Sequence, residues 1–148
     1  MKVRSEIEIN APREEVLAAI MDTERLGEWV DAHRAVLDAP EGELECGSTF
    51  RQKLRVAGLT FKVGWEVTRL ERPRLVEWRG TGPGGSEARV CYQLENGDGE
   101  STRFVYVNEF ELPGGKLADL AARKIGEERG RAEAEKSLRN LKELVEAE

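Results

Sequence analysis

The sequence predicts an α+β fold in which one antiparallel, seven-stranded sheet packs against a single long helix at the C-terminus. Three observations predict it. Polar and apolar residues alternate in successive runs from about residue 32 to 112, one strand and two short helical stretches precede these runs, and one long helical stretch follows them. A chain of 148 residues can bury a core of its own, and no linker or repeat divides it. We therefore expect a single domain over residues 1–148.

The first strand and the two short helices are expected within residues 3–29. Apolar and polar residues alternate over Val3–Ile9, which is typical of a half-buried strand. Asn10 precedes Pro12 and two glutamates, and we expect it to cap a helix whose first turn contains that proline. Asp22 interrupts this helix and caps a second short one, which ends near Trp29. Trp29 is expected to pack these helices beneath the long one.

Six further strands are expected after the short helices. Turn residues bound each run, and Asn96-Gly97-Asp98-Gly99 is the strongest hairpin signal in the chain. The last run is apolar on both faces, so the sequence does not assign its register. The expected strands are Arg34–Asp38, Ser48–Val56, Leu59–Thr68, Leu75–Gly80, Ala88–Glu95 and Thr102–Leu112. Connections this short predict an antiparallel meander with one apolar face.

The long helix is expected from Lys116 to about Val145, after Pro113-Gly114-Gly115 ends the sheet. Its length is about 45 Å at 1.5 Å per residue. Charges of opposite sign alternate between Lys124 and Glu135, which predicts a solvated face. Gly126 and Gly130 lie four residues apart in this stretch. Because glycine costs about 1 kcal/mol in a helix interior, the pair predicts a bend or the close approach of a bulky group.

The charge balance excludes several classes of partner. The chain carries 23 basic and 29 acidic residues, a net charge of −6, which argues against a protein that coats nucleic acid. No apolar run approaches the length of about 20 residues that spans a bilayer, so we expect no integral membrane association. The N-terminus shows no export signal, and we expect a cytoplasmic protein. No obligate protein partner is evident.

Composition also excludes most recognisable catalytic machinery. His33 is the only histidine, so a metal site with two histidines is impossible, and its polar neighbours place it on the surface. Cys46 and Cys91 show no metal-ligand spacing and are expected to stay reduced. The motifs of nucleophile elbows, dinucleotide sites and P-loops are missing. We therefore expect neither a metal nor another cofactor.

The apolar face of the predicted sheet is rich in aromatic residues, and the polar middle of the long helix cannot fill the space against it. That space is either a ligand cavity or a core closed by the aromatic side chains themselves. Residues of a pocket wall and residues of the core would lie on this same face of the sheet. The candidate ligand-binding residues are Phe50, Gln52, Phe61, Trp65, Val76, Trp78, Tyr92, Phe104 and Tyr106.

Four polar residues of this region are of chemical interest. Gln52 is an amide on an otherwise apolar face, so it meets either a ligand or another hydrogen-bond partner. Tyr92 and Tyr106 are either ordinary wall residues or phenol donors to a carbonyl or enolate. Asn108 lies on the strand of unassigned register. Tyr92, Tyr106 and Asn108 are the candidate catalytic residues.

Several segments together resemble the START-like or SRPBCC superfamily, in particular its polyketide cyclase/dehydrase and lipid-transport branch. They are Ile7–Val16, Asp22, Trp29, Trp65–Pro73, Gly80-Thr81-Gly82 and Ser137–Lys142. The resemblance covers nearly the whole chain and implies the helix-grip (Bet v 1-like) fold, a curved sheet around a long helix. It further implies an apolar cavity for lipids, polyketides or similar molecules, with Ala57-Gly58, Gly80–Gly85 and Pro113–Gly115 at its mouth. These motifs are signatures of the fold and not of an activity.

Three functions remain open from the sequence. The leading hypothesis is a carrier that binds a small hydrophobic molecule, because an aromatic face occurs without a recognisable catalytic constellation. The second is a polyketide cyclase or aromatase in which Tyr92, Tyr106, Gln52 or Asn108 orients a polyketone, and it requires at least two convergent polar side chains in the cavity. The third is a protein-interaction module, which requires a large exposed apolar patch.

Overall fold

The computed structural model describes residues 2–56, 58–110 and 120–148, and only the backbone of residues 120–127. Its seven strands form one antiparallel sheet in the order β1-β7-β6-β5-β4-β3-β2, so the predicted fold class is confirmed. The elements are β1 (Lys2–Ile9), α1 (Arg13–Ile20), η1 (Thr23–Arg25), α2 (Leu26–Trp29), β2 (His33–Asp38), β3 (Thr49–Val56), β4 (Leu59–Glu71), β5 (Leu75–Thr81), η2 (Pro83–Gly85), β6 (Glu87–Asn96), β7 (Thr102–Phe110) and α3 (Leu120–Glu146). The expected helix start and the Pro113–Gly115 turn lie outside the described residues.

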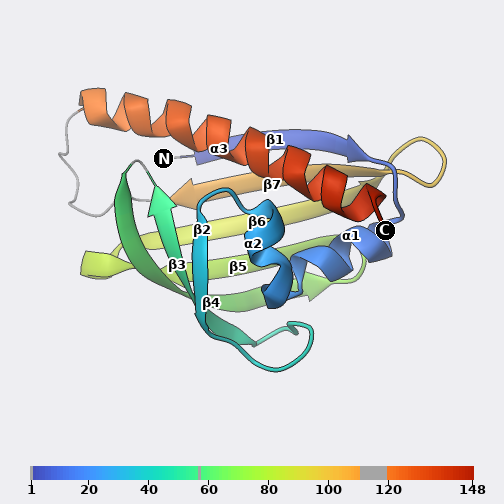
Figure 1. Cartoon of the computed structure of the whole chain (residues 1–148), viewed down its shortest axis with the longest axis horizontal. Helices are drawn as coiled ribbons and strands as arrows, with labels where there is room; N and C mark the ends of the chain where they lie inside the picture. Colours follow the sequence, from blue (N-terminus) through green and yellow to red (C-terminus); the bar gives the residue numbers. More distant parts are fainter. Residues whose placement is uncertain (1, 57, 111–119) are drawn as a thin grey trace.

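The sheet is a meander from β2 to β7, with β1 added beside β7. Figure 1 shows α3 lying along β1 and across the sheet, with its C-terminal end beside α1. The pairing assigns the register that the sequence left open, since Ser5 lies opposite Tyr106 and Ile9 opposite Thr102. Tyr106 and Asn108 consequently point to the side of α3, while Val105 and Val107 point to the outer face.

The start of α1 differs from its prediction. Pro12 occupies the N-cap position itself, no side chain caps the helix, and the Asn10 N–H donates to Glu146 Oε2 at 2.9 Å. Asn10 lies two residues before the cap, too early in the chain to serve as the capping residue. The second prediction is confirmed, because Asp22 Oδ1 accepts from the Glu24 N–H at 3.0 Å at the start of η1.

The concave face of the sheet has a packed end and a hollow end. At the packed end, α1, α2 and the C-terminal part of α3 supply fully buried apolar side chains. At the hollow end α3 contributes Gly130, where an added Cβ would lie 3.2 Å from Val3 Cγ2 and 3.5 Å from Phe110 Cζ. The predicted close approach is therefore confirmed at Gly130. The packed end contains Ile9, Val16, Leu17, Ile20, Leu94, Phe104, Leu138, Leu141 and Val145.

Candidate functional site

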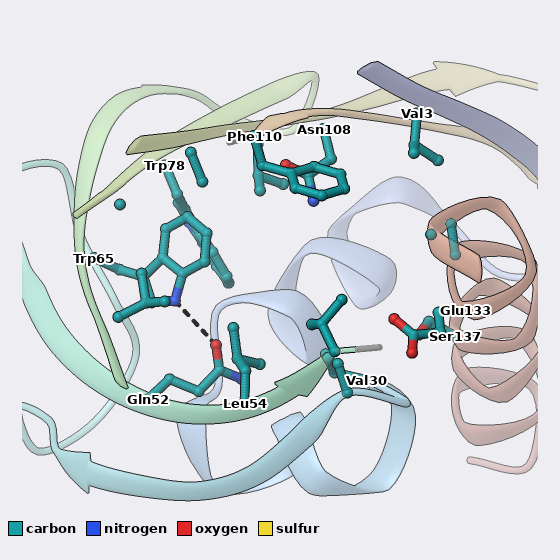
Figure 2. Close-up of a pocket in the computed structure, with 18 of the residues that line it drawn as sticks. Val3, Val30, Gln52, Leu54, Trp65, Trp78, Asn108, Phe110, Glu133 and Ser137 are labelled. Carbon is teal, nitrogen blue, oxygen red and sulfur yellow. Dashed lines mark hydrogen bonds between the residues drawn. The ribbon is translucent and has the colours of Figure 1, made fainter. Parts of the chain in front are cut away.

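The hollow end contains a cavity of about 140 Å³ between the sheet and α3. Six strands (β1 and β3–β7) contribute to its wall, together with α2, the segment that follows α2, and one stripe of α3. Figure 2 shows Trp65 and Trp78 on the wall facing Glu133 and Ser137 of α3, with Asn108 and Phe110 between them. The wall is mainly apolar, with a few polar groups at separate places.

Most of the candidate residues line this cavity. Three of them do not, and these three are buried in the same hydrophobic core cluster as side chains of α1, α2 and α3. Phe50 packs its ring edge-to-face against Trp78 at 5.3 Å, and Phe104 stacks on Tyr92 at 5.7 Å, so both contact aromatic residues of the wall without lining the cavity. Val76 is fully buried outside the cavity lining. The candidates that line the cavity are Gln52, Phe61, Trp65, Trp78, Tyr92, Tyr106 and Asn108.

Aromatic contacts fix the wall. Ring centroids lie 6.0 Å apart for Trp65 and Trp78, 5.1 Å for Trp78 and Tyr92, and 5.7 Å for Tyr92 and Tyr106. The Trp78–Tyr92 pair is edge-to-face, one of the favoured arrangements of aromatic rings. Gly80 makes room for Trp65, because an added Cβ would lie 2.8 Å from two carbons of the indole ring. Trp65 therefore lies directly over the backbone of β5.

Gln52 lies between Trp65 and His33 and is within hydrogen-bonding distance of both. The Trp65 indole N–H donates to Gln52 Oε1 at 2.9 Å, and Gln52 Nε2 lies 2.8 Å from His33 Nδ1. An indole nitrogen only donates, so the amide nitrogen points to His33 and Nδ1 accepts from it. His33 is half-buried at the start of β2, which corrects the expected surface position. Burial, and then the charge of Arg34, lowers its pKa.

Tyr106 and Asn108 form a second hydrogen-bonded pair of polar side chains in the cavity wall. Asn108 Nδ2 donates to the Tyr106 hydroxyl at 2.8 Å, and Asn108 Oδ1 is buried without a partner among the described residues. Burial raises the pKa of Tyr92 well above its ordinary value and raises that of Tyr106 to about 12. Both phenols therefore keep their protons at neutral pH and can serve as hydrogen-bond donors but not as bases.

Glu133 is a residue of the cavity lining that was expected on a solvated face. The charge alternation predicted a solvated face, and Arg131 and Glu135 are indeed exposed, but Glu133 is half-buried and lines the cavity. Burial, and then the charge of Asp31, raises its pKa. The signal that could have found it is spacing, because the cavity-lining positions of α3 follow the pattern i, i+3, i+4, i+7, i+8 of one helix face. They are Gly130, Glu133, Ala134, Ser137 and Leu138.

Trp29 has a second role beyond the structural one that the sequence predicted. It packs edge-to-face on Tyr92 at 6.1 Å, as a structural residue would, and it also lines the cavity. Its indole nitrogen and that of Trp78 are buried donors without a partner among the described residues. Both indoles therefore leave polar atoms near the cavity that no described side chain satisfies.

The other sites considered from the sequence contribute nothing to this cavity. Cys46 and Cys91 are free thiols outside it. In the described part of the chain, no group of three or more histidine, cysteine, aspartate or glutamate side chains is placed to hold a metal ion. No described helix is long and apolar enough to cross a membrane.

The family model for polyketide cyclase/dehydrase and lipid transport matches residues 1–146. The chain belongs to this family. Members of the family bind small hydrophobic ligands, which agrees with an aromatic cavity under a long helix. The predicted resemblance is thereby confirmed over nearly the whole chain.

Solved structures share the fold at low sequence identity. A conserved protein of Geobacillus kaustophilus is 19% identical with a TM-score of 0.77, covering 99% of this chain and 96% of its own. A Thermus thermophilus protein is 22% identical (TM-score 0.76, coverage 99% and 98%). The Zhui aromatase/cyclase of Streptomyces sp. R1128 is 20% identical (TM-score 0.76, coverage 99% and 93%). No curated protein matches this chain. At these identities the structures establish the fold alone.

Proposed function

We propose that this protein binds a small hydrophobic molecule in the cavity and carries it chemically unchanged. The observation that supports this function is the hollow itself, in which an aromatic wall faces the small residues Gly130 and Ala134 of α3. At about 24 cal/mol per Å³, an unfilled apolar cavity of 140 Å³ costs about 3 kcal/mol of stability. A bound hydrophobe recovers much of that free energy. Cavities of about 150 Å³ hold one aromatic ring, which sets the scale of the ligand.

The test compares native and denaturing mass spectra of freshly purified protein. We expect a discrete excess mass that disappears on denaturation. Ala134→Leu should abolish it, because Ala134 lines the cavity and is 6% exposed, and a leucine there fills the space. Ala132→Leu is the matched control, since Ala132 is exposed on the same helix. The proposal fails if the wild type carries no excess mass and small aromatic hydrophobes such as toluene do not raise its melting temperature.

A cyclase or aromatase is the second candidate, and the polar groups of the cavity favour it. Tyr92, Tyr106 and Asn108 lie on adjacent strands and border the same space, which meets the requirement for convergent polar side chains. Two protonated phenols can donate to a carbonyl or a developing enolate. Glu133, with its raised pKa, is then the group that accepts a proton from the polyketone.

The same mass spectrometry separates these two functions. A carrier returns the added molecule unchanged, whereas a cyclase converts a poly-β-ketone thioester mimic into a product lighter by water. Tyr106→Phe should abolish such conversion and leave simple binding of a hydrophobe in place. The interaction module gains little support, because Leu37 and Leu59 are the only large hydrophobic side chains exposed among the described residues.

A further inference from the structure

The cavity lining contains hydrogen-bond acceptors on α3 and β7. Figure 2 shows Glu133 and Ser137 projecting from α3 toward the cavity, with Asn108 on the wall formed by β7. Ser137 Oγ already accepts from the Asp31 N–H at 2.9 Å. Burial raises the pKa of Tyr106, the hydrogen bond from Asn108 lowers it, and the charge of Glu133 raises it.

Glu133 and Asn108 leave hydrogen-bonding capacity open toward this space. The Asn108 amide uses one of its two polar atoms on the Tyr106 hydroxyl and has no partner for the other among the described residues. An ionised carboxylate can only accept hydrogen bonds, and bonds to a charged acceptor are stronger than those between neutral groups. The ligand group favoured beside Glu133 and Asn108 Oδ1 is therefore a donor. The indole N–H groups of Trp29 and Trp78, unpartnered among the described residues, are donors themselves, and a hydroxyl oxygen of the ligand can accept from them.

Charge leads to the same conclusion. The charged side chains of the described cavity lining are the carboxylates Glu87 and Glu133, and no lysine, arginine or histidine is among them. A ligand carboxylate would meet the negative charge of the half-buried Glu133, where repulsion is less screened than in water, and the charges of Arg129 and Arg34 offset part of that repulsion. An alcohol or an ammonium group would instead find an acceptor in Glu133.

We infer that the cavity takes a hydrophobic molecule bearing a hydroxyl or amine, which donates to Glu133, and that it rejects molecules bearing a carboxylate. This inference rests on the proposed function, since it describes which hydrophobes the same cavity binds. It goes beyond the family description, which names no polar group of the ligand.

The test measures dissociation constants of four one-ring probes by titration calorimetry at pH 7: toluene, benzyl alcohol, benzylamine and benzoate. Each is titrated into the wild type, Glu133→Gln and Glu135→Gln. Glu135 is exposed on the same helix, so its variant makes the same change in charge away from the cavity. Circular dichroism and the melting temperature establish that each variant is folded.

For the wild type we expect benzyl alcohol and benzylamine to bind at least about tenfold more tightly than benzoate, the scale of one hydrogen bond to a charged group. Glu133→Gln should weaken benzylamine about tenfold and strengthen benzoate, while Glu135→Gln changes neither. The inference is overturned if benzoate binds the wild type as tightly as benzylamine, or if the two variants behave alike. Binding of toluene in those cases leaves the proposed function standing. If none of the four probes binds, the inference is overturned; if the native mass spectrum also shows no excess mass, the proposed function fails with it.

Discussion

Replacing Gln52 by leucine tests whether the Trp65–Gln52–His33 chain of hydrogen bonds stabilises the cavity wall. Gln52 is only 3% exposed, and its amide oxygen accepts from the Trp65 indole at 2.9 Å. Leucine has a similar size but cannot accept that bond, so the buried indole N–H loses its partner. His33 is half-buried, and water can replace the amide at its Nδ1.

The size of the effect follows from the orphaned donor. A buried N–H without a partner costs about 1–3 kcal/mol, and leucine adds little compensation because the site is already buried. We therefore expect Gln52→Leu to lower the free energy of unfolding by about 2 kcal/mol. For a chain of this length that corresponds to a fall in melting temperature of about 4–8 °C.

A double-mutant cycle with Trp65→Phe isolates the bond, measured by urea unfolding and followed by circular dichroism. In the Trp65→Phe background no indole donor remains at this position, so Gln52→Leu should cost about 1 kcal/mol less than in the wild type. Gln93→Leu on the outer face of β6 is the control and should change stability by less than about 0.5 kcal/mol. Effects of the two cavity substitutions that add to within about 0.3 kcal/mol would refute the reasoning.

Three further predictions concern the wall and the packed end. Gly80→Ala should lower the free energy of unfolding by about 1–3 kcal/mol, because the added Cβ clashes with Trp65. Gly64→Ala is the control, since no described atom lies within 4 Å of its added Cβ, and it should change that free energy by less than about 0.5 kcal/mol in the same urea assay. The lowered pKa of His33 means that the unfolded chain binds more protons below about pH 6.5, so stability should fall as the pH is lowered through that value. His33→Asn should flatten that slope, and an unchanged slope contradicts the assignment. Leu141→Ala, at a fully buried position, should lower the free energy of unfolding by about 2–5 kcal/mol. A decrease below about 1 kcal/mol, measured by calorimetry, would contradict close packing at this end.

Alternation along the strands was enough to identify the residues of the concave face. Gln52, Trp65 and Tyr92 all face α3 as predicted, because side chains along a strand point to alternate faces of the sheet whatever the neighbouring strands are. The strand Thr102–Phe110 was different, since Val105 and Val107 are apolar on the outer face and mask the period. Its register became known only from pairing with β1 and β6.

Which end of that face is hollow could not be predicted from the sequence. Phe50 and Phe104 have the same alternation as Trp65, but they are buried in the core cluster with side chains of α1, α2 and α3 and do not line the cavity. Such placement depends on contacts between residues far apart in the chain. Glu133 was missed for a related reason, because a charge ladder on a helix does not indicate which of its members faces the sheet.

The separation of the concave face into a packed end and a hollow end also bears on how such a protein can change over generations. Leu141 and Val145 of α3 are fully buried at the packed end and outside the cavity lining, whereas the wall of the cavity consists of other residues, with Leu138 common to both. Wall positions other than Gln52, Trp65 and Gly80 can therefore vary in size and polarity while the packed end is retained. Structures that share about a fifth of their residues with this chain keep the same backbone arrangement over nearly its full length. Substitutions at one end of the sheet can in this way reshape the cavity while the scaffold stays the same.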